Sequence, residues 1–247
     1  MSEPFPASPR QPMLNVPPVV TAVLAVMALV HGLRALLSRS ADLEVLLLFA
    51  FIPARYEGSF IPLPGGLAAD IWTFATYALI HADLTHLGFN AIWLLAFGTP
   101  LARRFGVLRF VLFCAVTAAA GAVAHLLTHP GQVQPMVGAS AIISGAMAAA
   151  MRFAFQPGGG MQWRGNMHLP AVPLFTALRD VRVLVFLGVW FGLNLLFGLG
   201  SVPLLGNDQP VAWQAHVGGF LVGLLLFGFF DPVRRSVAVQ NDPARPL

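Results

Sequence analysis

The sequence predicts an all-α, polytopic membrane protein, and its composition, its segment lengths and its arginine distribution all indicate this. The chain has 247 residues, of which 57% are hydrophobic and 10% are charged, and its mean hydropathy is +0.76. Soluble domains carry roughly 25% charged residues. Six apolar stretches have the length of about 17–25 residues that crosses a hydrocarbon core of ~30 Å. The predicted spans of this six-transmembrane-helix bundle are 17–37, 84–101, 105–127, 138–155, 181–199 and 213–230.

The chain divides into one membrane domain and two tails. Residues 1–16 are rich in proline and are predicted to be a disordered cytoplasmic tail. Residues 17–230 form the membrane domain. Residues 231–247 form a cytoplasmic tail that begins at Asp231-Pro232, where proline ends the last helix.

Two of the connecting segments are long. Within residues 38–83, the apolar stretches 44–53 and 70–80 are too short to span a membrane, so we expect interfacial or partly inserted elements of a structured outer loop. Residues 156–180 contain several glycines and prolines and are predicted to be an inner loop.

The arginines indicate the orientation of the chain. All 14 basic residues are arginine, and a cytoplasmic N-terminus places eleven of them inside and three outside, as the positive-inside rule favours. Arg34 and Arg39 follow the first span and oppose the rule locally. Because they follow its apolar core, we interpret the first span as uncleaved rather than as a signal peptide. No arginine cluster with interleaved aromatics indicates nucleic-acid binding.

Four polar residues lie where a membrane helix rarely carries them. With the N-terminus inside, the second, fourth and sixth spans all run from outside to inside. His86 and Asn90 begin the second span, Ser140 begins the fourth and His216 begins the sixth, so all four fall in one layer near the outer face. Asp83 is predicted to cap the second span.

The faces of these helices predict close packing. On the sixth span His216, Gly219 and Gly223 share one face, and small residues there let backbones approach. On the fourth span Ser140, Ser144 and Ala148 share another face. We expect these two faces to meet and to bring Ser140 to His216. Gly218 lies about 100° around the helix from Gly219, so Gly218→Val should be milder than Gly219→Val.

Each of these residues also has a purely structural interpretation. A serine in a membrane helix usually bonds to its own backbone or helps helices pack. A histidine near a helix end can sit at the interface, and Asn194 is interpreted as a hydrogen-bonding group between helices.

The shared layer favours chemistry at Ser140. A nucleophilic serine needs a base, which His216 would supply because histidine titrates near neutral pH. The developing oxyanion needs donors, and the Ser140 N–H, the His86 imidazole and the Asn90 amide could serve. No acidic residue lies clearly in the same layer, so the sequence predicts a Ser–His dyad.

Three motifs make the chain resemble the rhomboid intramembrane serine proteases over roughly residues 17–230. "HADLTHLGFN" (81–90) is similar to the family's His-x4-His-x3-Asn, "GASA" (138–141) to its Gly-x-Ser-Gly, and "AHVGGFLVG" (215–223) to its Ala-His-x2-Gly-x3-Gly. Ala141 departs from the pattern, since it replaces the glycine after the serine.

The resemblance implies a rhomboid-like bundle with Ser140 as nucleophile, His216 as base, and His86 with Asn90 at the oxyanion hole. It also implies residence in the lipid of a bacterial inner membrane and cleavage of other proteins' transmembrane segments.

Other functions are less well supported. The chain has neither His-Glu-x-x-His for zinc nor Gly-x-Gly-Asp for a paired-aspartate protease, so we expect no metal and no cofactor. A rhomboid-like pseudoprotease that binds or escorts membrane helices remains the alternative. A transporter is less favoured because paired half-length repeats are missing.

Overall fold

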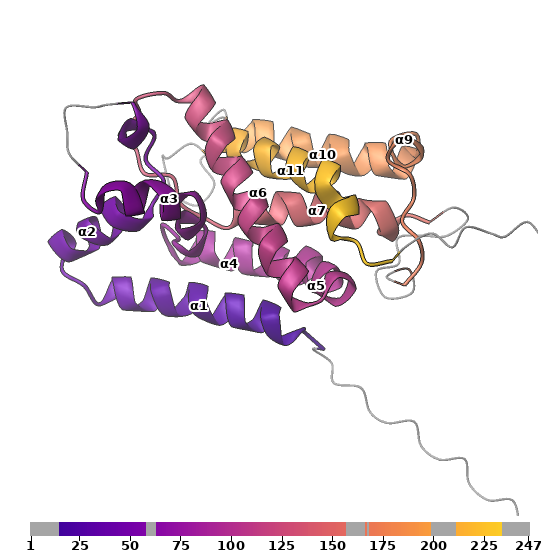
Figure 1. The fold of residues 1–247 in the computed structure, drawn as a ribbon, viewed down its shortest axis with the longest axis horizontal. Coiled ribbons are helices and arrows are strands. Elements are labelled where there is room, and N and C mark those ends of the chain that lie inside the picture. Colours follow the sequence, from indigo (N-terminus) through magenta and orange to yellow (C-terminus); the bar gives the residue numbers. More distant parts are fainter. Residues whose placement is uncertain (1–14, 58–62, 157–165, 167, 199–210, 234–247) are drawn as a thin grey trace, which may run out of the picture.

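The fold is a bundle of helices, shown in Figure 1. The computed structural model describes residues 15–57, 63–156, 166, 168–198 and 211–233. Most of the two predicted tails therefore lies outside the described residues. In chain order the helices are α1 (Pro18–Ala35), α2 (Arg39–Phe49), η1 (Pro53–Tyr56), α3 (Gly66–Thr76), η2 (Tyr77–Leu79), α4 (Leu84–Trp93), the π-helix η3 (Leu94–Gly98), α5 (Thr99–Phe105), α6 (Val107–Thr128), α7 (Ser140–Ala154), α9 (Leu174–Ala177), α10 (Val181–Gly198) and α11 (Trp213–Phe230).

Local sequence explains where several helices begin. Pro18 is the first residue of α1, a position where a missing N–H costs nothing. The Ser38 hydroxyl caps α2 by accepting from the Ala41 amide at 3.3 Å. Asp83 Oδ1 accepts from the His86 amide at 2.8 Å and caps α4, as predicted.

The second predicted span is one helix of three parts. α4, η3 and α5 follow one another without a break from Leu84 to Phe105. Pro100 has no N–H to donate to the turn before it, and the wider π-helical turn lies directly before it. The helix ends at Gly106, whose φ of 76° favours glycine.

By length and composition, three helices in the described part of the chain could cross a membrane, namely α1, α6 and α11. α7 and the stretch Val181–Leu196 of α10 are apolar but shorter. α7 has 15 residues and is therefore ~22 Å long. The described structure is all-α, as predicted, and an isolated β-bridge pairs Phe51 with Met136.

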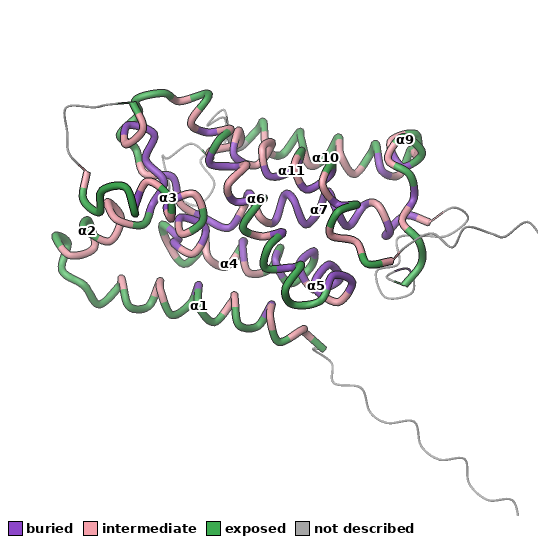
Figure 2. Tube along the Cα trace, viewed as in Figure 1, coloured by how far each residue is buried: buried purple, intermediate pink, exposed green. Residues whose placement is uncertain are grey.

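α7 is the central helix of the bundle. Figure 2 shows it buried along most of its length, whereas α1 at the edge of the bundle is largely exposed. Ala148, Ala149 and Ala150 have no exposed surface. Small side chains let neighbouring backbones approach closely, which explains why a helix so poor in large residues occupies the centre.

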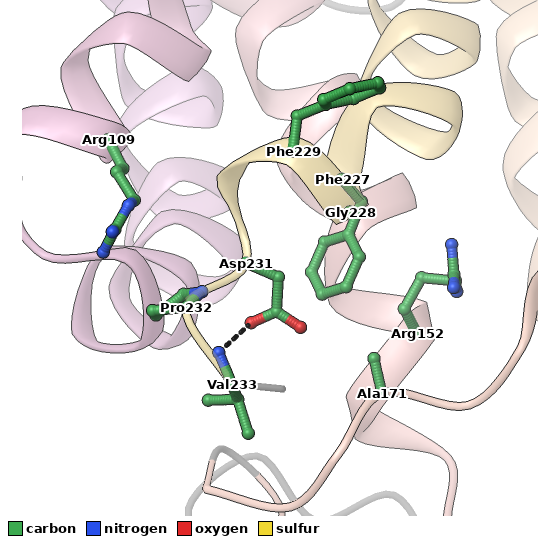
Figure 3. Close-up of a pocket in the computed structure, with 9 residues that line it drawn as sticks. All are labelled: Arg109, Arg152, Ala171, Phe227, Gly228, Phe229, Asp231, Pro232 and Val233. Atoms are coloured by element: carbon green, nitrogen blue, oxygen red, sulfur yellow. Dashed lines mark hydrogen bonds between the residues drawn. The ribbon is translucent and has the colours of Figure 1, made fainter. Parts of the chain in front are cut away.

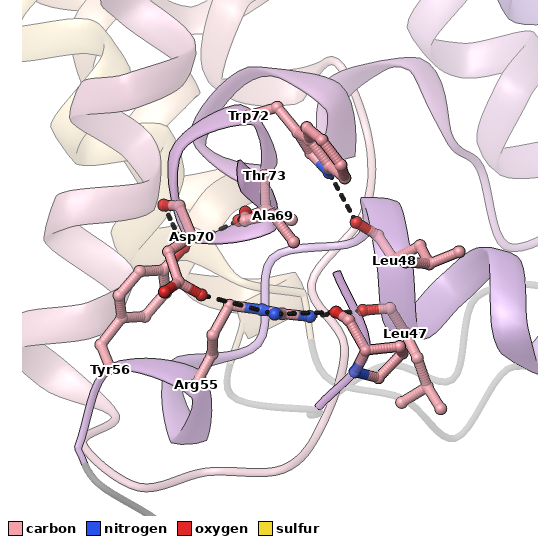
Figure 4. A network of polar contacts seen from close by, with 9 residues as sticks. Leu47, Leu48, Arg55, Tyr56, Ala69, Asp70, Trp72 and Thr73 are labelled. Carbon is pink, nitrogen blue, oxygen red and sulfur yellow. Dashed lines mark hydrogen bonds and ion pairs between the residues drawn. The ribbon is translucent and has the colours of Figure 1, made fainter. Parts of the chain in front are cut away.

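The segment between α1 and α4 is structured, as the sequence predicts. α2, η1, α3 and η2 gather at one end of the bundle (Figure 1). Figure 4 shows Arg55 between the Leu47 carbonyl, at 2.6 Å, and the Asp70 carboxylate, at 3.4 Å. The Trp72 indole donates to the Leu48 carbonyl at 2.7 Å. These bonds connect α2, η1 and α3 into one unit.

The opposite end of the bundle carries most of the described arginines. Arg104, at the end of α5, forms a two-pronged ion pair with Asp231, both at 2.8 Å, and its side chain is fully buried. Arg104 also donates to the Leu169 carbonyl at 2.9 Å. Arg152, near the end of α7, donates to the Val172 carbonyl at 2.8 Å. The ends of α5, α7 and α11 are therefore connected at this arginine-rich end.

Candidate active site

Ser140 is the first residue of α7, and the loop before it explains this position. Gly138 has a φ of +118°, which lies outside the helical region, so the helix begins only after it. The first N–H groups of a helix have no partner within the helix. The Ser140 amide is therefore a donor that points out of the N-terminal end of α7. The Ser140 side chain is partly buried.

The loop before Ser140 is held by residues of the outer segment. The Gly138 amide donates to the Tyr77 carbonyl at 3.0 Å, and the Tyr77 hydroxyl donates to the Ala118 carbonyl on α6 at 2.9 Å. Phe51 and Met136 exchange backbone hydrogen bonds of 3.1 and 2.8 Å. Sequence analysis missed these contacts, because nothing in a single sequence marks pairs so far apart along the chain.

His86 lies against this loop. A Cβ atom built on Gly138 would come within 2.7 Å of His86 Nε2, so the imidazole occupies the space beside the glycine. The Ala82 amide donates to His86 Nδ1 at 3.5 Å, which leaves the Nε2 side as the donor in the neutral ring. His81, buried, meets His86 edge to face with ring centroids 5.1 Å apart.

Asn90 lies one turn after His86 on α4 and is buried. One N–H of its amide donates to the His86 carbonyl at 2.9 Å. This bond within the helix orients the amide and uses only one of its two N–H donors.

His216 lies in the first turn of α11 and contacts a residue on α10. His216 Nδ1 forms a hydrogen bond with Asn194 Oδ1. The Asn194 amide donates to the Trp190 carbonyl at 2.8 Å. Within the described residues the structure shows no hydrogen bond between Ser140 and His216.

α7 and α11 pack backbone to backbone. A Cβ atom on Gly219 would lie 2.7 Å from the Ala141 carbonyl carbon, and one on Gly223 would lie 2.5 Å from the Cα of Gly145. The residues of α7 that meet the two glycines are thus Ala141 and Gly145. They lie one position along from the predicted face of Ser140, Ser144 and Ala148, of which Ser144 and Ala148 are buried.

Gly218 is also closely packed, but against a different helix. A Cβ atom on Gly218 would lie 2.5 Å from the Ala120 carbonyl oxygen and 2.6 Å from the Ala124 Cβ, both on α6. The adjacent glycines of α11 therefore pack against two different helices, Gly218 against α6 and Gly219 against α7. The periodicity of α11 alone could not reveal that α6 packs on its second face.

Ala141, which departs from the family motif, is accommodated by a glycine on α6. The Ala141 side chain is buried, and a Cβ atom on Gly121 would lie 2.5 Å from the Ala141 Cβ. The same atom would lie 2.9 Å from the Tyr77 hydroxyl and 3.0 Å from the Ala215 carbonyl oxygen. The extra methyl group of Ala141 therefore points toward α6, where Gly121 leaves room for it.

We expect Gly121→Ala to lower the thermal stability of the protein, because overpacking a filled interior costs ~1–3 kcal/mol. The double variant Gly121→Ala/Ala141→Gly should recover part of this loss, since the contact between the two methyl groups is removed while those to Tyr77 and Ala215 remain. Thermal denaturation of the wild type, both single variants and the double variant in one detergent measures this coupling. Strictly additive effects would contradict the packing of Ala141 on Gly121.

A cavity of about 410 Å³ lies away from these residues, at the arginine-rich end (Figure 3). Its lining includes Arg109 near the start of α6, Arg152 near the end of α7 and Asp231 directly after α11. Ser140 and His216 lie at the opposite ends of α7 and α11. Within the described residues no group of three His, Cys, Asp or Glu side chains could hold a metal ion.

The chain is similar to known rhomboid proteins. Rhomboid protease GlpG of Haemophilus influenzae is 26% identical over 176 residues, which are 70% of this chain and 76% of that protein. Rhomboid-related protein 3 of Homo sapiens is 28% identical over 65% of this chain and 36% of its own length. Rhomboid protease GlpG of Serratia proteamaculans is 27% identical over 68% of this chain and 50% of its own length.

The matched region thus spans between about one third and three quarters of these relatives. The rhomboid domain of the family matches residues 68–231, which include α4 to α11 and the candidate residues His86, Asn90, Ser140 and His216. Because this match covers more than half of the chain, the chain belongs to the rhomboid family of multi-pass membrane proteins.

Proposed function

We propose that this protein is an intramembrane serine endopeptidase that cleaves transmembrane segments of other membrane proteins. Ser140 is the nucleophile and His216 is the base, and the Ser140 N–H, His86 and Asn90 form the oxyanion hole. The observation that carries the proposal is the contact between the first turn of α7 and the second turn of α11, where Gly219 meets Ala141 directly after Ser140. The names of the bacterial relatives, which are proteases, support the same reaction class.

The proposed reaction is an acyl transfer to Ser140 followed by hydrolysis of the acyl-enzyme. Ser140 Oγ attacks the peptide carbonyl carbon while the His216 imidazole takes the hydroxyl proton. The oxyanion that forms is stabilised by the donors at the α7 N-terminus and on α4. His216 then protonates the leaving amine, and an ester remains on Ser140. Water attacks this ester with His216 again as base, which releases a carboxylate and restores Ser140.

The oxyanion donors have suitable positions for this role. The His86 ring lies against Gly138, two residues before Ser140, so a donor from α4 and the amide at the start of α7 face the same space. Asn90 adds a buried amide one turn away on α4. Donors held in place before the reaction stabilise developing charge without reorganising.

We further propose that the protein resides in a bacterial inner membrane with a cytoplasmic N-terminus. The arginine-rich end of the bundle includes the start of α1, since Arg103 donates to the Asn15 carbonyl. The positive-inside rule favours this end in the cytoplasm. Ser140 and His216 lie at the other end, where water can enter from the outer face.

Substrate helices would enter sideways past α10, whose residues Leu193, Leu195 and Leu196 are exposed.

A pseudoprotease that binds and escorts membrane helices is the second candidate. It would need the same close helix packing but would not need a serine beside a histidine. The chain carries both Ser140 and His216 at the N-terminal ends of packed helices, which favours the protease.

Labelling with a serine-directed fluorophosphonate tests the proposal. The purified protein in detergent is treated with the probe, digested and analysed by mass spectrometry. We expect one adduct at Ser140, because only a serine with a base beside it reacts readily. Ser140→Ala should abolish labelling, whereas Ser144→Ala, one turn further along α7, should not. A wild-type protein that stays unlabelled and cleaves no transmembrane substrate would favour the escort function.

A further inference from the structure

We infer that Asn194 of α10 is a positioning residue that holds His216 in the tautomer required of a base. The inference rests on the proposed function and adds a third polar residue to the predicted pair. Its starting point is the hydrogen bond between His216 Nδ1 and Asn194 Oδ1, which connects α10 to α11.

The neighbours of Asn194 determine which way its amide points. The Trp190 carbonyl oxygen can only accept a hydrogen bond, so the atom of Asn194 that faces it at 2.8 Å must be the NH2 group. The amide oxygen then faces His216. Since this oxygen can only accept, His216 Nδ1 must carry the hydrogen.

The tautomer of His216 follows directly. A neutral imidazole carries one N–H, so a proton on Nδ1 leaves Nε2 with a free lone pair. Nε2 is then the atom that can accept the Ser140 proton. In other nucleophile–base pairs the base is likewise oriented by a third group, which can be an asparagine. Asn194 is neutral, so it can orient the ring without placing a buried charge in the membrane.

The packing around Asn194 favours a fixed geometry. Trp190 and Phe191, on the preceding turn of α10, contact Phe220 on α11, with ring centroids 4.7 and 5.6 Å from it. Phe220 lies one turn after His216. The aromatic cluster and the hydrogen bond therefore connect the same two helices over two successive turns. Displacement of α10 would move Asn194 Oδ1, the hydrogen-bond acceptor, away from His216 Nδ1.

Kinetics of Asn194→Leu test the role in catalysis. Leucine has the branched shape of asparagine, with two larger methyl groups in place of the amide oxygen and NH2, and it has no hydrogen-bonding group. We expect kcat to fall ~10–100-fold, less than the ~10⁴-fold attributed to the charged aspartate of a Ser-His-Asp triad. KM should change by less than ~2-fold, because the interaction acts on the base rather than on substrate binding. Val185→Ala, which alters an exposed residue nearer the start of α10, is the matched control and should keep the wild-type kcat.

The ¹⁵N chemical shifts of His216 report its tautomer independently of catalysis. The protein is labelled with ¹⁵N-histidine in the Ser140→Ala background, and the His216 signals are identified among those of 7 histidines by their loss in His216→Ala. At neutral pH we expect Nδ1 to carry the hydrogen and Nε2 to be unprotonated. Adding Asn194→Leu should shift the population toward the Nε2–H tautomer. A residue that only joins two helices would leave the tautomer unchanged.

Two results would overturn the inference, namely a wild-type kcat in Asn194→Leu or an Nε2–H tautomer of His216 in the protein with Asn194 intact. Either result leaves the protease proposal standing if the wild type cleaves and labels at Ser140. An inactive and unlabelled wild type would instead overturn the protease proposal, and the ¹⁵N shifts would still decide whether Asn194 sets the tautomer.

Discussion

Ser140→Ala and His216→Ala should each abolish cleavage of a transmembrane substrate while the protein still inserts and folds. Removing the nucleophile leaves no atom to form the acyl-enzyme, and removing the base leaves the hydroxyl unactivated. Losses of ~10⁴–10⁶-fold are typical when either group of such a pair is removed. Both residues are partly buried at the N-terminal ends of their helices, so substitution by alanine should change the packing little.

Cleavage rates of a reporter transmembrane segment in proteoliposomes measure this effect. Ser144→Ala on the same helix and His168→Ala at an exposed site are the matched controls and should cleave normally. Chelators should leave the wild-type rate unchanged, because the proposed mechanism uses no metal ion. Near wild-type cleavage by Ser140→Ala or His216→Ala would reject the assignment of that residue.

Gly219→Val should remove most of the activity although every proposed catalytic group remains. A Cβ atom at this position would meet backbone atoms of Ala141, with the carbonyl carbon at 2.7 Å and the Cα at 3.0 Å. Backbone atoms cannot rotate away as a side chain can, so α7 and α11 must separate. Because Ala141 follows Ser140 directly, the separation displaces the nucleophile from His216. A displacement of about 1 Å can cost ~10²-fold in rate.

Gly228→Val is the matched control for this variant. Gly228 lies on α11, where an added Cβ would meet no atom within 4 Å. We expect Gly228→Val to keep its activity and its melting temperature, whereas Gly219→Val loses stability by ~1–3 kcal/mol. Gly218→Val is not a suitable control, because it would disrupt the contact with Ala120 on α6. Wild-type activity in Gly219→Val would show that this contact does not hold Ser140 in place.

The positions of the helices along the chain could be predicted, because the length of each apolar stretch is a local property of the sequence. Apolar length predicted helices at 84–101 and 213–230, and the structure has helices over 84–105 and 213–230. Ser140 and His216 could be predicted as candidate catalytic residues because a polar residue in an apolar stretch is rare and because both lie in the first turn of their helices. Helical rise alone then places them at comparable depth when the two helices run in the same direction.

Which faces meet could only be decided by the tertiary structure. Helical periodicity showed that Gly219 and Gly223 share a face, but it could not show that they meet Ala141 and Gly145 instead of the face of Ser140. If α7 is rotated about its axis by one residue, different residues meet α11, but the apolar pattern of the sequence is the same. The same limit applies to Gly218, whose contact with α6 depends on where a third helix packs.

The sequence by itself determined the class of the protein, most of its helices and the candidate catalytic residues, because hydropathy and polar residues within apolar stretches are local properties. Only the tertiary structure decided that Asn194 orients toward His216, that Gly121 makes room for Ala141, and that Arg104 pairs with Asp231. Each of these pairs joins residues far apart along the chain. Their hydrogen bonds and contacts form only after several helices have packed, so no local pattern can encode the pairing.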